Sequence, residues 1–283
     1  MKKIIFSSIL VLLLSVILWI IWGNNAIQTN NISILNENIP DSFNGYKIVH
    51  ISDLHNAQFG NNNEILLNKI KEADPDIIVV TGDLVDSRHT NIQVGIDFAA
   101  NAQKIAPVYY VNGNHESRLS AYEDIENSLI DEGIVVLKDY FVEIKKNDDT
   151  IRITGISDPD FILSDNKKNS IDSLLSHLRG FEPDDNFNIL LTHRPEYFDL
   201  YVKHKYDLVF SGHAHGGQFR IPFIGGIFSP GQGLFPEYDS GLYSKNGTSM
   251  IVSRGLGNSL FPFRLNNNPE IIIIELKNKT EVE

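Results

Sequence analysis

The chain has 283 residues, of which 42% are hydrophobic, and a formal net charge of -12 at pH 7. The acidic composition makes its general surface a poor match for nucleic acid, so we expect no nucleic-acid partner. The chain contains no cysteine, which excludes disulfide bonds, thiolate zinc sites and cysteine nucleophiles.

The first residues form a candidate membrane segment. The run from Ile4 to Trp22 carries no charge, and a helix of this length spans about 28 Å, close to the hydrocarbon thickness of a bilayer. Lys2 and Lys3 precede the run and no charge follows until Glu37, so the positive-inside rule places the folded domain outside the cytoplasm. We predict an uncleaved transmembrane anchor over residues 1–23. A cleaved signal peptide is the alternative, although the run is long for one.

Residues 24–44 are rich in asparagine and other polar side chains, and we expect them to form a tether to one domain over residues 45–283. In the first half of that domain, apolar runs alternate with amphipathic patterns. They predict strands at 46–51, 77–81 and 108–111, and helices at 64–73, 92–105 and 121–131. Such alternation is typical of a mostly parallel sheet covered by helices.

The second half has closer strand spacing. The predicted strands are 134–137, 140–144, 151–156, 187–192, 208–211, 241–244, 249–253 and 271–276, with a helix at 170–178. The first three are expected to be antiparallel, and Asn246-Gly247 predicts a hairpin turn. Two mixed sheets packed face to face, with helices outside, accommodate all these elements.

The segment 216–236 is rich in glycine and phenylalanine and directly follows a pair of histidines. Long connections of this kind are usually functional or disordered. Two interpretations remain open: a lid or groove for an apolar part of a substrate, or a cover for a sheet edge.

Five short motifs place polar side chains directly after predicted strands. In chain order they are Asp53-Leu54-His55, Gly82-Asp83, Gly113-Asn114-His115-Glu116, Thr192-His193 and Gly212-His213-Ala214-His215. Side chains that follow parallel strands collect at one edge of the sheet. If the backbone stays extended, the members of each Asp-x-His or His-x-His pair share one face. Each motif alone is weak, because a Gly-Asp after a strand is more often a turn. Together they predict a cluster of metal ligands.

The set resembles the calcineurin-like metallophosphoesterase superfamily, and within it the membrane-associated bacterial phosphodiesterase subgroup. The resemblance rests on the motifs above, on the Gly-Gly-Gln that follows His215, and on Ser253-Arg254-Gly255-Leu256-Gly257, and it covers about residues 45 to 277. The subgroup more often has threonine at the position of Ala214, which is not an expected ligand. The resemblance implies an α/β fold of two mixed β-sheets packed as a sandwich and flanked by helices.

The resemblance also implies a dinuclear metal centre. The expected ligands are Asp53, His55 and His215 for one ion, Asn114, His193 and His213 for the other, and Asp83 between them. A bridging hydroxide would attack phosphorus. His115 is expected to stabilise developing charge and protonate the leaving oxygen. Arg254 would either bind a substrate phosphate or form a structural ion pair. The donors suit two divalent ions, with manganese as first choice and zinc or iron as alternatives.

These features predict metal-dependent hydrolysis of phosphodiester or pyrophosphate bonds, with a lipid-linked or cell-envelope phosphate as the candidate substrate. A nucleotide-lipid pyrophosphatase is an alternative, and it requires the site to lie at the cytoplasmic face. A non-catalytic binding scaffold of the same fold is another, but such a scaffold should lack several ligands, and here every expected ligand is present.

Overall fold

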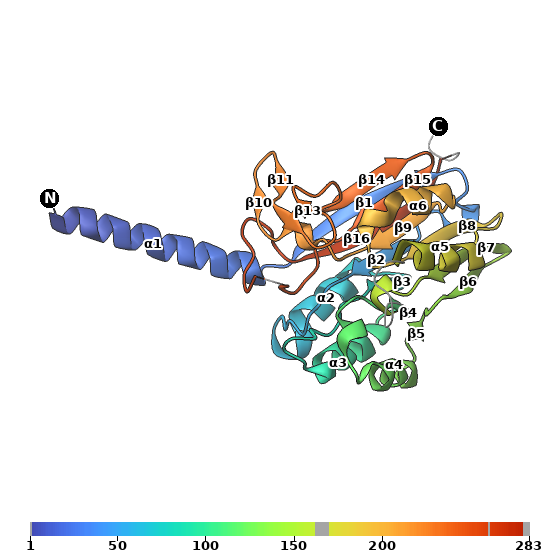
Figure 1. The fold of residues 1–283 in the computed structure, drawn as a ribbon, viewed down its shortest axis with the longest axis horizontal. Helices are drawn as coiled ribbons and strands as arrows, with labels where there is room; N and C mark the ends of the chain where they lie inside the picture. Colours follow the sequence, from blue (N-terminus) through green and yellow to red (C-terminus); the bar gives the residue numbers. More distant parts are fainter. Residues whose placement is uncertain (1, 162–169, 260, 280–283) are drawn as a thin grey trace.

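The computed structural model describes residues 2–161, 170–259 and 261–279. The chain begins with α1 (Lys2–Asn25), whose apolar side chains are almost all exposed. Figure 1 shows that α1 projects away from the folded body, which it joins only at its C-terminal end. The helix is long and apolar enough to cross a membrane.

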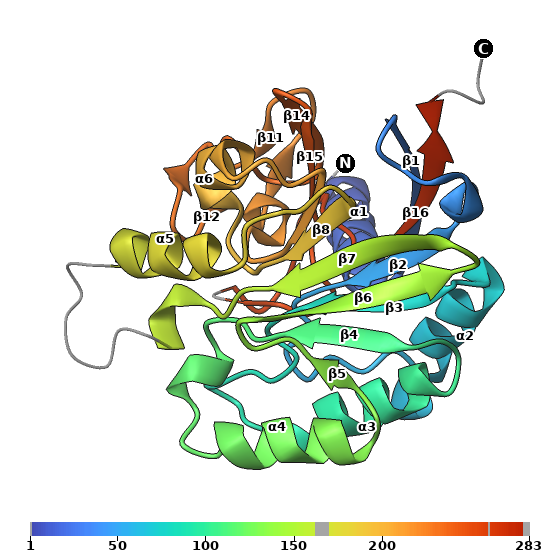
Figure 2. The same ribbon diagram turned by 90° about the vertical axis from the view of Figure 1, so that its right-hand side faces the viewer.

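The first sheet has six strands. In spatial order they are β1 (Gln28–Asn36), β16 (Glu270–Asn278), β2 (Lys47–Ile51), β3 (Ile77–Thr81), β4 (Val108–Val111) and β5 (Val135–Val136). The strands from β2 to β5 are parallel, whereas β16 runs antiparallel to β2. The helices α2 (Glu64–Ala73), α3 (Ile92–Gln103) and α4 (Tyr122–Asp131) connect the parallel strands and lie together on one face of this sheet (Figure 2).

The second sheet also has six strands. In spatial order they are β14 (Gly241–Lys245), β15 (Thr248–Val252), β9 (Leu208–Ser211), β8 (Phe187–Leu191), β7 (Asp149–Gly155) and β6 (Tyr140–Lys146). The four central strands are parallel, and the two edge strands are antiparallel to their neighbours. The helices α5 (Ser170–Gly180) and α6 (Phe198–Lys203) pack on its outer face through residues such as Leu178 and Tyr201.

The two sheets pack face to face around a shared apolar core. Ile48 and Val79 from the first sheet and Ile189 and Phe210 from the second all belong to this core and are fully buried. Separate apolar clusters lie between each sheet and its helices. The predicted fold class, a sandwich of two mixed sheets flanked by helices, is confirmed. Because the two sheets share this core, the carboxyl ends of their parallel strands are held at fixed positions relative to one another.

The predicted tether over residues 24–44 is wrong for most of its length. Gln28–Asn36 forms β1, which pairs in parallel with all nine residues of β16. Ile32 and Ile34, two positions apart, face the inter-sheet core, and Ile34 is only 3% exposed. The asparagines of this strand make the alternation hard to recognise in the sequence. The alternation is enough to bury one face of an edge strand, so the folded body begins close to the end of α1.

Two further features differ from the sequence-based expectations. α6 was not predicted, because its six residues are too few to show helical periodicity. The segment 216–236 is not a single irregular loop: it contains β10 (Arg220–Ile221) paired with β11 (Gly225–Gly226), and β12 (Phe228–Ser229) paired with β13 (Gly233–Leu234).

Candidate metal centre

All seven predicted metal ligands lie at the carboxyl ends of parallel strands. Asp53 and His55 follow β2, Asp83 follows β3, Asn114 follows β4, His193 follows β8, and His213 and His215 follow β9. Every one of these residues is buried. Asp53, His55, Asp83 and His215 form one group, and Asp83, His193 and His213 form another; within each group the potential ligand atoms lie within 4.8 Å of one another. The first sheet supplies all the oxygen ligands, and the second supplies only imidazoles.

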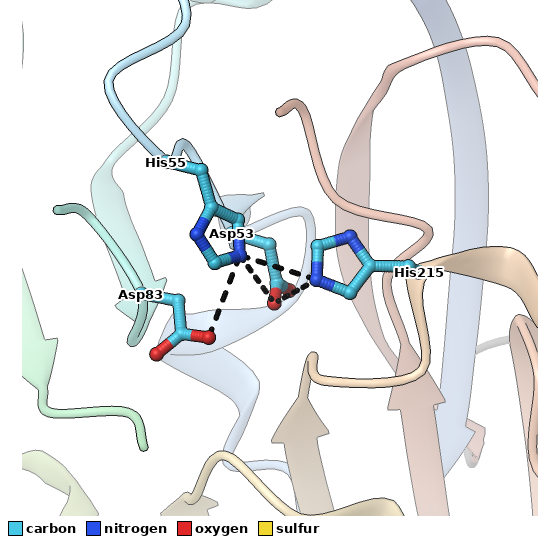
Figure 3. A group of neighbouring side chains, drawn as sticks. All are labelled: Asp53, His55, Asp83 and His215. Atoms are coloured by element: carbon cyan, nitrogen blue, oxygen red, sulfur yellow. Dashed lines mark hydrogen bonds and ion pairs between the residues drawn. The ribbon is translucent and has the colours of Figure 1, made fainter. Parts of the chain in front are cut away.

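The first group is drawn in Figure 3, where the side chains point toward a common centre. His55 Nε2 lies 3.2 Å from His215 Nε2 and 3.5 Å from Asp83 Oδ2. Asp53 Oδ1 lies 3.1 Å from His215 Nε2. The other oxygen of Asp53 accepts hydrogen bonds from Ser52 Oγ and from the backbone N–H of His213. The hydrogen bond from His213 to Asp53 joins the two sheets directly at the cluster.

The second group shares Asp83 with the first. His193 Nε2 lies 3.3 Å from Asp83 Oδ2, and the rings of His193 and His213 are 4.9 Å apart. His193 Nδ1 donates to the carbonyl oxygen of Thr81 at 2.6 Å, and a carbonyl can only accept. In the neutral ring the proton is therefore on Nδ1, which leaves the lone pair on Nε2, the nitrogen that lies beside Asp83.

Several buried atoms of the predicted ligands have no hydrogen-bond partner among the described residues, and two of them are especially suited to a metal ion. These two are Nε2 of His193 and Oδ1 of Asn114. A buried polar atom without a partner is costly, so such atoms need an explanation. A neutral imidazole nitrogen and an amide oxygen are both good ligands for a divalent cation. The residues present therefore fit bound metal.

The backbone at the cluster is unusual. Five of the seven predicted ligands have a positive φ, between 46° and 64°: Asp53, His55, Asp83, His213 and His215. The expectation of an extended backbone was wrong, since left-handed turns rather than strand alternation direct these side chains into the cluster. A non-glycine residue in such a conformation costs on the order of 1–3 kcal/mol and tends to occur at functional sites.

Close backbone approach explains two glycines of the motifs. A Cβ on Gly212 would overlap Ser52 and the carboxylate of Asp53, and a Cβ on Gly113 would overlap the carboxylate of Asp83. No side chain fits at either position. These glycines let the turns of the two sheets pack directly against the carboxylates.

Charge within the cluster is balanced between carboxylates and imidazoles. Burial opposes ionisation of Asp53 and Asp83, but His215 and His193 outweigh it and hold the pKa of both carboxyls well below the usual range. Burial likewise disfavours a charged His193, yet Asp83 outweighs it and raises the pKa of this imidazole to about 10. Without metal, protons on imidazoles compensate the buried carboxylates.

A family model described as calcineurin-like phosphoesterase matches residues 46–217, more than half of the chain. The chain belongs to the calcineurin-like phosphoesterases. It is 30% identical over 261 residues to the uncharacterized metallophosphoesterase YkuE of Bacillus subtilis, covering 89% of this chain and 86% of that protein. It is 27% identical over 244 residues to the phosphodiesterase YaeI of Escherichia coli, covering 82% of each.

A third relative is named as a transmembrane protein. The chain is 26% identical over 283 residues to a transmembrane protein with metallophosphoesterase domain of Danio rerio, covering 96% of this chain and 63% of that protein. Taken together, the family model and the relatives establish a hydrolase of phosphoesters. The family uses a dinuclear divalent metal centre, and this phosphoesterase has the corresponding His/Asp cluster.

His115 lies beside the first group without belonging to it. Its ring centroid is 4.5 Å from that of His55. Its Nδ1 accepts the backbone N–H of Ser87 at 3.1 Å, so in the neutral ring the proton is on Nε2. Burial lowers the pKa of His115 to about 4. The residue is therefore a neutral imidazole with one N–H to donate.

Glu116 holds two of the turns in this phosphoesterase together. Its buried carboxylate accepts the backbone N–H groups of Asp83 and Gly113, both at 2.9 Å, and of Val85 at 3.1 Å. The hydrogen bonds go to the turns after β3 and β4, so Glu116 fixes Asp83 relative to Asn114 through the backbone.

The two arginines near the centre differ in their contacts. Arg254, a candidate for phosphate binding, pairs with Glu270 at 2.7 Å and donates to Gln28 at 2.9 Å. Arg194 instead contacts the cluster: its Nη1 lies 3.3 Å from His213 Nε2, while Asp158 accepts from its other nitrogens at 2.6 and 2.9 Å.

Sequence reasoning missed Arg194 and Asp86. Asp86 Oδ1 lies 3.4 Å from His115 Nδ1, and Asp86 forms a third compact group with His55 and His115. The sequence does place both residues near the motifs: Arg194 directly follows a predicted ligand, and Asp86 is the second carboxylate after β3.

Proposed function

We propose that this phosphoesterase hydrolyses phosphodiester or pyrophosphate bonds at a dinuclear centre in which Asp83 bridges the two ions. The proposal rests mainly on one observation. Asp83 Oδ2 lies 3.5 Å from His55 Nε2 in one group and 3.3 Å from His193 Nε2 in the other, while Asp83 Oδ1 accepts the backbone N–H of His115. A single oxygen therefore faces both groups. The proposed ligand sets are those implied by the family: Asp53, His55 and His215, and Asn114, His193 and His213.

The roles of the remaining residues follow from their contacts. When bound, two divalent ions supply the hydroxide nucleophile and neutralise charge on the phosphate. His115, whose neutral ring carries its proton on Nε2, would donate a hydrogen bond to the leaving oxygen and stabilise the charge that develops there. Arg194, held by Asp158, is placed to contact a phosphate oxygen. For Arg254, the pair with Glu270 favours the structural interpretation.

We also propose that α1 anchors the enzyme in the cell membrane, with the catalytic domain on the extracytoplasmic side. The apolar length of α1 and the two lysines before it support this orientation. An anchored enzyme works in a thin layer above the bilayer, which favours lipid-linked or cell-envelope phosphates as substrates. Manganese is the proposed metal, because mixed nitrogen and oxygen donors suit it.

The test uses the full chain in detergent. The protein is stripped of metal with chelator and then given Mn²⁺, Zn²⁺ or Mg²⁺ separately, and turnover of bis-nitrophenyl phosphate is compared with turnover of nitrophenyl phosphate. We expect metal-dependent hydrolysis with preference for the diester and with Mn²⁺ most effective. Two bound ions per chain by elemental analysis should accompany full activity. Folded protein that binds no metal would overturn the proposal and leave the binding scaffold.

A further inference from the structure

A groove runs from the metal centre to the C-terminal end of α1, where the helix meets the folded body. Its first part has a volume of about 550 Å³ and is lined by His55, Asp86, Arg88 and His89 among others. Its second part has a volume of about 380 Å³ and is lined by Ile20, Ile21, Phe59 and Phe263 among others. Both parts are lined by Ala57, Asn258 and Pro262, so they adjoin. Each volume falls within the range of about 300–1,000 Å³ found for ligand pockets.

The two parts of the groove differ in chemistry. The part at the metal centre is lined mostly by polar and charged residues, and its Arg88 guanidinium pairs with Asp86 at 3.3 Å while staying partly exposed to an anionic group. The part at α1 is lined by more apolar residues, among them Phe59, Leu256 and Phe263, and ends on two isoleucines of the helix. A ligand that matches both parts has a charged head and an apolar chain.

The end of α1 is fixed to the body beside this groove. Asn24 Nδ2 donates to the carbonyl oxygen of Arg264 at 3.0 Å, and the backbone N–H of Arg264 donates to Asn24 Oδ1 at 2.7 Å. The exposed Trp22 lies two residues before Asn24, where an interfacial aromatic residue is expected. The membrane surface defined by α1 therefore lies within about one helical turn of the groove.

Exposed apolar residues gather on the same side. Figure 1 shows β10, β11 and β13 on the side of the body from which α1 leaves. The docking face, as we call it, consists of Phe223, Ile224, Leu234 and Phe235, which are 109%, 64%, 69% and 62% exposed. The one charged residue of segment 216–236, Arg220, pairs with Asp239 at 3.0 Å. Apolar residues exposed to this extent usually mark an interaction surface.

We propose that the docking face inserts into the bilayer that holds α1, and that the groove takes a lipid phosphodiester from that bilayer. The phosphate lies beside His55, and the chain passes Phe263 to reach Ile20 and Ile21. The inference deepens the proposed function and rests on it for the identity of the reacting group. Because the face carries almost no net charge, docking depends on apolar insertion and should occur on neutral lipid.

Docking is tested without reference to activity. The chain lacks cysteine, so Phe223→Cys and Phe235→Cys each give one labelling site in the full chain for an environment-sensitive dye. Tyr140→Cys, on β6 and 58% exposed, is the matched control. In phosphatidylcholine vesicles, lipids brominated in their chains should quench the first two labels and not the third, equally at low and high salt. Equal quenching at all three sites would overturn the docking.

The groove is tested with two substrates that differ only in the length of their apolar chain. Nitrophenyl hexadecyl phosphate and nitrophenyl methyl phosphate share a leaving group and differ only in the apolar chain. We expect kcat/KM for the hexadecyl ester to exceed that for the methyl ester at least about tenfold. Phe263→Ser should bring this ratio close to one. Phe261→Ser is the matched control: it lies in the same loop with similar exposure but does not line the groove, so the ratio should persist.

The two hydrolysis rates and their ratio distinguish a folding defect, a failed groove and a failed proposed function from one another. A folding defect lowers both rates and leaves the ratio unchanged. Turnover of both esters with a ratio near one in the unmodified enzyme would overturn the groove and leave the proposed function intact. Turnover of neither ester with any metal would overturn the proposed function, and the labelling experiment would still decide the docking.

Discussion

The metal centre and the docking face depart from ordinary folding rules in opposite ways. At the metal centre, carboxylates and imidazoles are fully buried in left-handed turns and are held by backbone hydrogen bonds. At the docking face, phenylalanine, leucine and isoleucine side chains are exposed to solvent on two short hairpins and the residues beside them. Folding alone favours neither arrangement, since polar groups are normally outside and large apolar groups inside.

The contrast suggests a division of labour. In the proposed function, the residues of the buried cluster act on a phosphate whatever ester it carries. In the further proposal, the face and the groove recognise an apolar chain. Changes to the cluster should therefore affect every substrate alike, whereas changes to the face should alter the choice among substrates. The predictions below test this division.

The largest effect is expected from Asp83→Asn. Asparagine still offers one oxygen to the backbone N–H of His115, so the turn persists, but the charged oxygen between His55 and His193 is lost. We expect kcat/KM to fall more than about 10³-fold for short-chain and long-chain diesters alike. Steady-state kinetics with restored Mn²⁺ measures this. Asp97→Asn, on the exposed side of α3, is the control, and a fall under tenfold in Asp83→Asn would contradict the bridging role.

The next effect is expected from His115→Ala. If His115 Nε2–H stabilises the charge that develops on the leaving oxygen, its loss should slow hydrolysis of an alkyl diester by about 10²-fold or more. A nitrophenyl diester should suffer much less, because nitrophenolate delocalises its own charge. The comparison of the two leaving groups is the measurement, with His204→Ala as control. Equal losses for both would assign His115 to metal or substrate binding instead.

A smaller effect is expected from Glu116→Gln. The carboxylate accepts three backbone N–H groups, whereas glutamine must turn its NH₂ group toward one of them. Asp83 should then shift, and metal affinity should fall about 10–100-fold. Titration of the chelated protein with Mn²⁺ measures the affinity. Glu123→Gln, exposed on α4, should bind Mn²⁺ normally, and unchanged affinity in Glu116→Gln would exclude the positioning role.

The parts of this enzyme that sequence could predict are those governed by local pattern. The runs 64–73, 77–81 and 208–211 appear in the structure with the predicted bounds, because apolar periodicity and burial coincide there. The seven expected ligands are those that the family resemblance implies, and their motifs stand directly after predicted strands. Parallel strands necessarily bring such positions to one edge.

The parts that escaped prediction depend on contacts distant in sequence. β1 is held by β16, some 240 residues later, and its asparagines hide the alternation. The left-handed turns at His213 and His215 are imposed by tight packing of Gly212 against Asp53. Likewise, no local pattern reveals that Arg194 reaches His213 while Arg254 turns to Glu270. Side-chain partners across two sheets follow from the packing.

The smallest predicted effect is on the pH dependence of the metal-free protein. The pKa of His193 is raised to about 10 despite burial, because Asp83 lies beside it, and the pKa of His55 is raised as well. A raised pKa stabilises the fold below the unfolded value, about 6.5, and this stabilisation is lost as pH rises toward 10. The chelated protein should therefore unfold at progressively lower temperature between pH 7 and 9. Mn²⁺ affinity should rise over the same range by up to about tenfold per pH unit, because metal must displace the proton.

The opposite signs of these two trends identify the cluster as their source. Replacing His193 with glutamine should reduce both slopes, since one of the two imidazoles with a raised pKa is removed. Replacing Phe235 with serine should flatten neither, because the docking face contains no titrating group near the ligands. If stability and Mn²⁺ affinity instead changed in the same direction with pH, or if Phe235→Ser altered either slope, the buried cluster and the apolar face would be energetically coupled, and the proposed division of labour would fail.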